Sequence, residues 1–415
     1  MQPTVFTNVV IFDGSGSAAF PGEIRVEDNR IAQVAKGAER VARDGAEIID
    51  GHGMTLMPGM TEAHSHLCFS SAVDRIDSER MLAPEQSLFS MAHNAKTLLD
   101  YGFTSAYSGG AHRPTLEVAL RDEIAAGWIP GPRLKASSFE RNTKGERHDW
   151  SLNLQDAKQF VQDMIDAGVD NIKMVIDGHG ARNEPHWYDL NYDDLTVSEM
   201  VKVAHDAGLS TTSHTFTEEG TKRALRGGVR VLYHLNFCDE ECFDLIEQRK
   251  SDIFVAPTVG VHHASIEAGL NRFKPREEAV EKIGSFRSAE GHAKTVPELR
   301  KRGVRICIGG DYGFPFNPQG WNARDIEILV KTHGYTPAEA LGAATMNGGI
   351  LMGMGDELGL IRNGYLADFL IVDGDPLADV AILQDKERLA AILKDGKFHK
   401  RALPSESGAM KIAAE

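Results

Sequence analysis

From residue 58 to about residue 352 the chain alternates short apolar runs with helical stretches of ten or more residues. Such alternation is typical of parallel βα units and constrains the fold more than any other feature of the sequence. Many helical stretches finish at a glycine shortly before the next run, as expected of helix C-caps. The eight predicted strands span residues 55–66, 103–108, 133–138, 171–176, 210–216, 229–236, 253–259 and 305–310, and the helical stretches include 84–101, 115–127, 154–168, 197–208, 218–227, 239–250 and 289–303.

Eight parallel strands with helical crossovers favour an α/β protein with a (β/α)₈ TIM-type barrel, whose active site lies at the carboxyl ends of the strands. An open doubly wound sheet is the alternative. That fold usually carries a G-x-G-x-x-G motif after a strand, and no such motif follows any of the eight runs. The barrel is therefore the favoured architecture.

Short β-rich runs flank the barrel segment on both sides. At the N-terminal end they cover residues 4–12, 23–35 and 46–50, and at the C-terminal end 359–376, 389–394 and 397–399, after a helix expected at 336–352. We expect these strands to join in one small composite β-sandwich domain formed by both chain ends. The predicted domains are 1–57 with 353–405 for the composite β domain and 58–352 for the barrel, followed by a tail at 406–415 that is polar enough to fray.

The composition narrows the class of partner. The formal net charge is −15 and no Lys/Arg-rich run occurs, so a nucleic-acid partner is not expected. The chain shows neither a signal-peptide pattern nor a run of about 18 apolar residues, so we expect no membrane span and a cytoplasmic location. The expected partner is a small-molecule substrate, and we expect a homo-oligomer.

The cysteines do not form a disulfide framework. Only four occur in 415 residues, at positions 68, 238, 242 and 307, which suits a reducing compartment. Cys238 and Cys242 have the spacing of half a zinc site, but they begin a predicted helix and lack a second Cys/His pair at structural spacing. Partly buried thiols are the favoured interpretation.

Polar residues fall at the ends of the predicted strands, and this pattern carries the functional prediction. His64 and His66 end the first strand, where residues i and i+2 point to the same side. Lys173 stands inside the apolar fourth strand, where burial strongly disfavours an ammonium group. The remaining members are His214 near the end of the fifth strand, His234 near the end of the sixth, for which a core histidine is the alternative, and Asp311 after the eighth. At one rim of a barrel this set predicts a site for two divalent metals with room for a bridging water.

The same residues resemble the amidohydrolase superfamily of the binuclear-metal, carboxylated-lysine type, which includes imidazolonepropionase-like and prolidase-like enzymes. The matching marks are His64-Ser65-His66 after Pro58-Gly59, Ile172-Lys173-Met174, Ser213-His214-Thr215, Tyr233-His234-Leu235, Gly309-Gly310-Asp311 and the β-rich tail from Asp356. The resemblance covers nearly the full length. It implies two divalent metal ions, most simply Zn²⁺, with His64 and His66 on one and His214 and His234 on the other. It also implies a CO₂-derived carboxylate on Lys173 as the bridge, and Asp311 as ligand and general base.

Three segments depart from the family pattern. Thr61-Glu62 stands where the family usually has Ile-Asp, residues 143–148 replace a Thr-Gly-Gly-His run, and Tyr233-His234-Leu235 replaces Glu-His-Gly. These changes affect the substrate rim more than the metal ligands. The substrate of any single relative therefore cannot be transferred to this chain.

Several further residues are candidates for substrate binding on the loops after the strands. His262 and His263 follow the seventh strand and either face the pocket or form a solvated loop pair. Arg141 and His148, with His179, Arg182 and His186, are candidates to hold a substrate carboxylate or carbonyl. Tyr312 begins an aromatic-rich segment, 312–321, which predicts an apolar or ring-bearing substrate group, with packing onto a neighbouring helix as the alternative.

The sequence thus predicts a metal-dependent hydrolase of a C–N bond in an amide, N-acyl amino acid or dipeptide, carbamate or urea. A lactonase or other ester hydrolase uses the same site and is the nearest alternative. A non-catalytic scaffold is a further alternative. The presence of every expected ligand argues against it.

Overall fold

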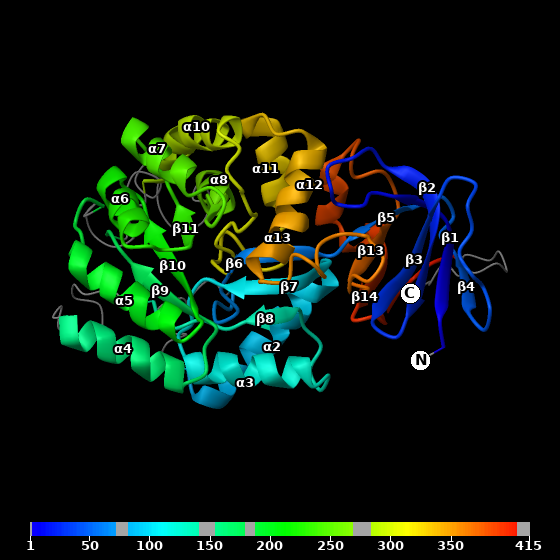
Figure 1. Cartoon of the computed structure of the whole chain (residues 1–415), viewed down its shortest axis with the longest axis horizontal. Coiled ribbons are helices and arrows are strands. Elements are labelled where there is room, and N and C mark those ends of the chain that lie inside the picture. Colours follow the sequence, from blue (N-terminus) through cyan, green and yellow to red (C-terminus); the bar gives the residue numbers. More distant parts are fainter. Residues whose placement is uncertain (1, 72–81, 141–153, 179–186, 269–283, 405–415) are drawn as a thin grey trace.

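Strands from both ends of the chain meet in one eight-stranded sheet in the computed structural model, which describes residues 2–71, 82–140, 154–178, 187–268 and 284–404. The strand order is β15-β14-β13-β5-β1-β2-β3, and β4 pairs with β1. Figure 1 shows these blue and orange-red strands side by side at one end of the molecule. They span Thr4–Ile11 (β1), Phe20–Glu27 (β2), Arg30–Lys36 (β3), Glu47–Asp50 (β4), Thr55–Pro58 (β5), Phe369–Val372 (β13), Leu389–Lys394 (β14) and Lys397–Arg401 (β15).

A shared core holds the two chain ends together. The rings of Phe6 in β1 and Phe369 in β13 meet edge to face with centroids 5.2 Å apart. Both are fully buried in a cluster that also takes residues from β2, β5 and β14. The strands at 4–12, 46–50, 389–394 and 397–399 were predicted from the sequence, whereas the range 359–376 contains only the short strand β13. The strands from the two chain ends form one eight-stranded sheet, and the expected sandwich stays a prediction.

The first predicted barrel strand is in fact two strands in two different sheets. β5 pairs with β1 and β13, and β6 (Met60–Ser65) pairs with β7 (Phe103–Ser108). The break falls at Gly59, where a Cβ atom would lie 2.2 Å from the Thr104 hydroxyl oxygen, so only glycine allows this close approach. The polypeptide passes from the small sheet to the parallel strands at this residue.

The parallel strands occur as two sheets, which isolated β-bridges and backbone hydrogen bonds connect. One is β6-β7-β8 (Arg133–Lys135), and the other is β9 (Asn171–Val175), β10 (Ser210–Thr215), β11 (Val231–His234) and β12 (Phe254–Ala256). A parallel bridge joins Ser137 to Asn171, and another joins Val255 to Ile306. The Ala63 N–H donates to the carbonyl oxygen of Ile308, which brings the eighth run beside the first. These pairings fit a TIM-type barrel.

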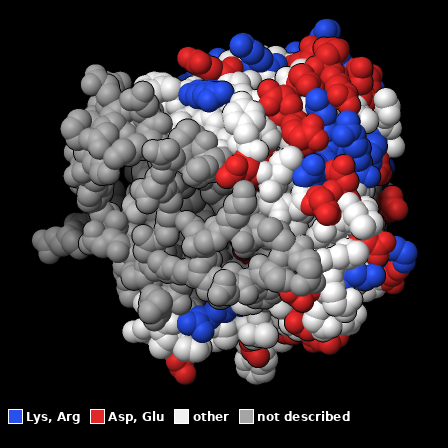
Figure 2. All heavy atoms as spheres, turned by 90° about the vertical axis from the view of Figure 1, so that its left-hand side faces the viewer, with Lys and Arg blue, Asp and Glu red and all other residues white. Residues whose placement is uncertain are grey.

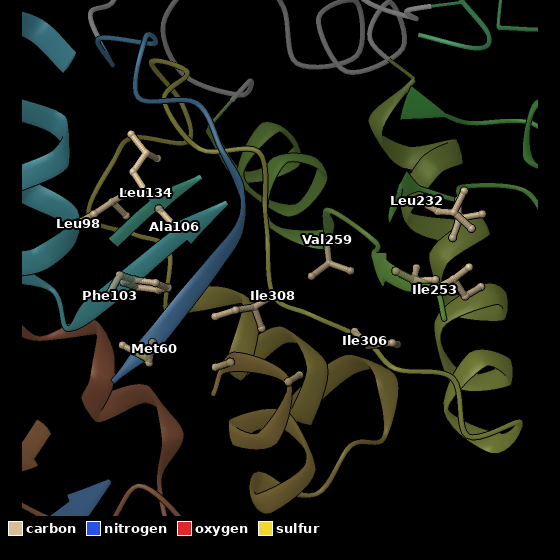
Figure 3. Close-up of a cluster of buried hydrophobic side chains, with 14 of the residues drawn as sticks. Met60, Leu98, Phe103, Ala106, Leu134, Leu232, Ile253, Val259, Ile306 and Ile308 are labelled. Carbon is tan, nitrogen blue, oxygen red and sulfur yellow. The ribbon is translucent and has the colours of Figure 1, made fainter. Parts of the chain in front are cut away.

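Helices pack on the outside of the parallel strands (Figure 1). Figure 3 shows the apolar layer between them, where Leu98 of α2 lies near Phe103 and Ala106 of β7. No bounds were predicted from the sequence for helices α8 and α11, and the helix expected at 336–352 divides at Thr345 into α12 and α13. The helices span Pro84–Asp100 (α2), Pro114–Ala125 (α3), Leu154–Asp166 (α4), Asp194–Asp206 (α5), Glu218–Arg226 (α6), Glu240–Gln248 (α7), Val259–Ala268 (α8), Ser285–Lys301 (α10), Arg324–His333 (α11), Pro337–Ala344 (α12) and Met346–Leu351 (α13).

Charges of both signs are intermixed on the described part of one face of the molecule (Figure 2). On the described part of the face in Figure 2, lysines and arginines alternate with acidic side chains. Ion pairs link neighbouring helices, as between Arg226 of α6 and Glu241 of α7 at 2.5 Å. Exposed pairs of this kind contribute little stability individually, about 0 to 1 kcal/mol.

None of the described helices is long and apolar enough to cross a bilayer.

Cys238 and Cys242 are partly and fully buried thiols in the structure. Cys242 is buried, its thiol donates to the Glu218 carbonyl oxygen at 3.3 Å, and its N–H donates to the side chain of Asp239, the N-cap of α7. Cys238 is half-buried. Among the described residues, the group able to hold a metal ion contains neither cysteine.

Candidate metal centre

The six predicted ligands come together at the carboxyl ends of the parallel strands. The side chains of His64, His234 and Asp311 each offer a ligand atom, and these atoms lie within 4.8 Å of one another. The other three residues are buried beside them. Five of the six, all except the fully buried Lys173, line one cavity. Its lining residues are His64, His66, Phe69, Glu140, His214, Phe216, His234, Val261, His262, Ser265, Ser285, Asp311, Phe314 and Phe316.

His64 and His66 present neighbouring nitrogens to the cavity, as their spacing on one strand predicted. Their Nε2 atoms are 3.2 Å apart. Because a carbonyl oxygen only accepts hydrogen bonds, His66 Nδ1 donates to the Gly110 carbonyl at 2.9 Å, which leaves the Nε2 lone pair of the neutral ring for a metal. The ring of His64 stacks on Tyr233 with centroids 3.7 Å apart. Burial, together with the Lys173 charge, lowers the pKa of His64 well below its usual value.

Lys173 is fully buried, as the sequence predicted. Its Nζ atom lies 3.3 Å from His64 Nε2 and 3.4 Å from Glu140 Oε1. It also lies 4.5 Å from the centroid of the Tyr233 ring. Burial lowers the pKa of Lys173, and the nearby carboxylates of Glu140 and Asp311 oppose that shift. A lowered pKa favours the neutral amine, the form that can react with CO₂.

Glu140 is a site residue that the sequence analysis missed. It follows the third run by two residues, so an acidic side chain at the end of a predicted strand was the available signal. Its Oε1 atom lies 3.8 Å from His66 Nε2 in addition to the contact with Lys173. The structure thereby supplies the neutralising partner that a buried lysine requires.

His214 and His234 form the second pair of imidazoles. Their ring centroids are 4.2 Å apart, and both rings are buried at the cavity. His234 Nδ1 lies 2.7 Å from the Thr258 hydroxyl, and its backbone carbonyl accepts a hydrogen bond from His292 Nε2 at 2.9 Å. His234 and Thr258 have φ angles of +75° and +51°, sparsely populated values that cluster at functional sites. His234 therefore lines the cavity instead of packing in the apolar core.

Asp311 completes the set from the end of the eighth run. Its Oδ1 atom lies 3.3 Å from His66 Nε2, and 15% of its side chain is exposed. Its φ angle is +57°. Burial, then the charge of Glu140, raises the pKa of Asp311 to about 7, and Lys173 opposes that shift.

Two buried carboxylates support the backbone around these ligands. Glu62, which replaces the aspartate usual in the family, accepts hydrogen bonds from the His64 N–H at 3.1 Å and from Asn322 Nδ2 at 2.8 Å. Asp325 accepts from the Gly309 N–H at 3.0 Å and from the Tyr312 hydroxyl at 2.8 Å. Tyr312, predicted to bind substrate, is thus buried on Asp325 and is not among the described residues that line the cavity.

Aromatic side chains form the apolar wall of the cavity. Phe314 and Phe316 come from the predicted aromatic segment and stack with centroids 5.4 Å apart. Phe69 stacks on the ring of His66 at 4.4 Å, and Phe216 lies beside His214 at 4.2 Å. The predicted metal ligands and the aromatic wall therefore meet directly.

The predicted loop histidines lie on helix α8. His262 is buried and lines the cavity, and its Nε2 atom has no hydrogen-bond partner among the described residues. Burial lowers the pKa of His262 to about 3, so the ring is neutral. His263 is half-buried and points toward His333, with ring centroids 6.4 Å apart. Arg141, His148, His179, Arg182 and His186 lie outside the described residues.

The donor set fits divalent metal ions. Two ligands of a tetrahedral zinc ion with bonds of 2.0–2.1 Å are about 3.3 Å apart. The His64–His66 and His66–Asp311 donor atoms are separated by 3.2 and 3.3 Å. His64 Nδ1 is buried without a hydrogen-bond partner among the described residues. Imidazole and carboxylate ligands suit zinc and similar metals.

The comparisons with known proteins agree with this geometry. The sequence model of the amidohydrolase family matches residues 55–398. Ochratoxinase of Aspergillus niger is 27% identical over 435 aligned positions, which cover 96% of this chain and 86% of that protein. Imidazolonepropionase of Symbiobacterium thermophilum is 26% identical and covers 86% of this chain and 85% of its own. The crystal structure of a Xaa-Pro dipeptidase is similar in fold, with a TM-score of 0.84 at 23% identity over 96% of this chain and 100% of that chain. The chain belongs to the amidohydrolase family and is a hydrolase that acts on carbon–nitrogen bonds.

Proposed function

We propose that the chain is a metal-dependent hydrolase that cleaves an amide or related C–N bond in a small substrate with an aromatic or apolar group. The observation that carries the proposal is the convergence of His64, His234 and Asp311 on one point beside an aromatic wall. The ochratoxinase and imidazolonepropionase relatives support a C–N bond as the target class. The proposed bond classes are amide, N-acyl amino acid or dipeptide, carbamate and urea.

The proposed architecture is a closed (β/α)₈ barrel over residues 58–352 with a composite β domain from 1–57 and 353–405. The contacts that link Ser137 with Asn171, Val255 with Ile306, and Ala63 with Ile308 support a closed ring of strands. In such a barrel the loops after the strands select the substrate.

We propose that two divalent metals, most simply Zn²⁺, bind to His64, His66, Lys173, His214, His234 and Asp311. Bound metals of this kind polarise a carbonyl group and lower the pKa of a water molecule to about 7. The N-carboxylated form of Lys173 would be the bridging ligand. Its complete burial and its position 3.3 Å from His64 Nε2 support that role.

Asp311 is the proposed general base. Its carboxylate takes the proton of the attacking water and passes it to the leaving nitrogen. Bound divalent cations would favour the charged carboxylate of Asp311, which is the form that accepts a proton. Its remaining exposure to the cavity leaves it within reach of a substrate.

The cavity wall would orient the substrate. Phe69, Phe314 and Phe316 offer ring faces to an aromatic or apolar group. The neutral ring of His262 offers a polar contact for a substrate carbonyl. Arg141, His148 and His263 remain predictions as substrate-binding residues.

Elemental analysis of protein purified without chelator, followed by a substrate screen, tests the proposal. We expect close to two divalent metals per chain and hydrolysis within a panel of N-acyl amino acids, dipeptides, aryl carbamates and phenylureas. Lactones form the comparison arm, and a preference for them would identify an ester hydrolase instead. Full activity with almost no metal would contradict the metal-dependent mechanism.

A further inference from the structure

Glu140 is not one of the six predicted ligands, yet its carboxylate lies beside two of them, His66 and Lys173. Glu140 lies in the segment after β8. The β-bridge between Ser137 and Asn171 places this segment beside β9, which carries Lys173. Glu140 lines the cavity with 17% of its side chain exposed. Its Oε1 atom lies 3.4 Å from Lys173 Nζ and 3.8 Å from His66 Nε2. It therefore points inward, toward the ligands.

The backbone is shaped to admit this side chain. Gly110 follows β7 with a φ angle of +142°, and a Cβ atom there would lie 2.4 Å from Glu140 Cγ. Only glycine leaves this space open. The same residue accepts the hydrogen bond from His66 Nδ1, so one backbone segment holds both side chains beside each other.

Three donor atoms lie around His66 Nε2 at distances close to those between ligands of one metal. His66 Nε2 is 3.3 Å from Asp311 Oδ1, 3.2 Å from His64 Nε2 and 3.8 Å from Glu140 Oε1. Ligands of one zinc ion are separated by about 3.3 Å, so Glu140 needs only a small side-chain adjustment.

The charges of the site point the same way. Glu140 and Asp311 place two carboxylates in one largely buried cavity, where like charges repel strongly. Two divalent cations bring more positive charge than Asp311 and a carboxylated Lys173 neutralise. A third anion therefore lowers the electrostatic free energy of a metal-loaded buried site.

We propose that Glu140 is an additional ligand of the metal that His64 and His66 hold. The inference rests on the proposed metal-dependent function and extends its ligand set. In the metal-free protein Glu140 instead neutralises Lys173.

Competition of metal-free protein with a chromophoric chelator for Zn²⁺ tests this assignment. Removing a neighbour that only supports a ligand typically lowers metal affinity 10- to 100-fold, so Glu140→Gln should weaken one of the two Zn²⁺ sites by about 100-fold or more. Glu140→Ala should do the same, and the visible spectrum of the Co²⁺-loaded protein should change in both variants. Glu117→Gln is the control, because Glu117 is a fully buried glutamate that is not among the described residues that line the cavity.

The outcomes separate the inference from the proposed function. If the wild type binds two metals and hydrolyses substrate but Glu140→Gln binds Zn²⁺ with wild-type affinity, the ligand assignment is wrong. A raised KM in such a variant would show that Glu140 contacts the substrate instead. If the wild type itself binds no metal, the proposed function fails before Glu140 is tested.

Discussion

The hydroxyl oxygen of Thr258 lies 2.7 Å from Nδ1 of His234. When Nδ1 carries the proton and donates a hydrogen bond to this hydroxyl, Nε2 keeps the lone pair that a metal needs. Thr258→Val keeps the branched shape and removes the acceptor, so we expect metal affinity to fall about 10- to 100-fold. Zinc affinity measured by chelator competition checks this, with Thr258→Ser as the control that retains the hydroxyl. Equal affinity in the valine variant would mean that Thr258 does not orient His234.

Lys173 should link metal content to activity. If its carboxylated form bridges the metals, Lys173→Ala should lose both together, and a short carboxylic acid or added bicarbonate should restore part of each. Elemental analysis and hydrolysis assays on the same samples provide the measurement. A variant with wild-type metal content would exclude Lys173 as a ligand.

Asp311 should affect the chemical step more than metal binding. Asp311→Asn keeps an oxygen that can ligate and removes the base, and a general base typically contributes about 10²- to 10⁴-fold, so we expect kcat to fall by roughly 10³-fold. Metal content should stay near normal. A loss of less than about tenfold would assign the proton transfer to another group, such as His262.

Glu117 should make stability depend on pH. It is fully buried, its Oε2 accepts from the Ser137 N–H at 2.8 Å, and burial raises its pKa to about 7 from 4.5. A raised carboxyl pKa gives stability that is fully present below pH 4.5 and is lost as the pH rises toward 7. Relative to Glu117→Gln, the wild type should therefore lose up to about 3 kcal/mol of unfolding free energy between pH 4.5 and pH 8.

Urea unfolding at several pH values measures this difference. Glu123→Gln, an exposed substitution on the same helix α3, serves as the control and should show no comparable change with pH. A constant difference between wild type and Glu117→Gln across the range would show that Glu117 titrates normally.

The convergence of the proposed metal ligands could be predicted from the sequence, because strand ends in a parallel sheet converge on one edge. His64 and His66 needed only the period of a strand, and Lys173 was conspicuous as a charge in an apolar run. Glu140 also stands near the end of a predicted strand, but its importance becomes clear only from its contact with Lys173 on a neighbouring strand. Tyr312 follows Asp311 directly, yet its hydroxyl bonds Asp325, a partner that sequence proximity does not reveal.

The fold shows the same limit. Regular alternation predicted the runs at 103–108, 171–176 and 210–216 to within one residue, because each is bounded by its own turn residues. The runs at 133–138, 229–236 and 253–259 contain shorter strands than predicted. The eighth run has a single bridge at Ile306, and α8 begins three residues after β12, without a separate start signal. The division at Gly59 depends on Thr104, which lies far away in the sequence.

The break at Gly59 joins the small sheet to the parallel strands through one continuous segment, β5 to β6. Pro58 at the end of β5 pairs with Phe369 of β13, and His64 follows six residues later in β6. A displacement of β13 within the small sheet would thus be transmitted through one short, extended segment to the first metal ligand. A strand near the C-terminal end of the sequence is therefore joined through six residues to His64, near the opposite end.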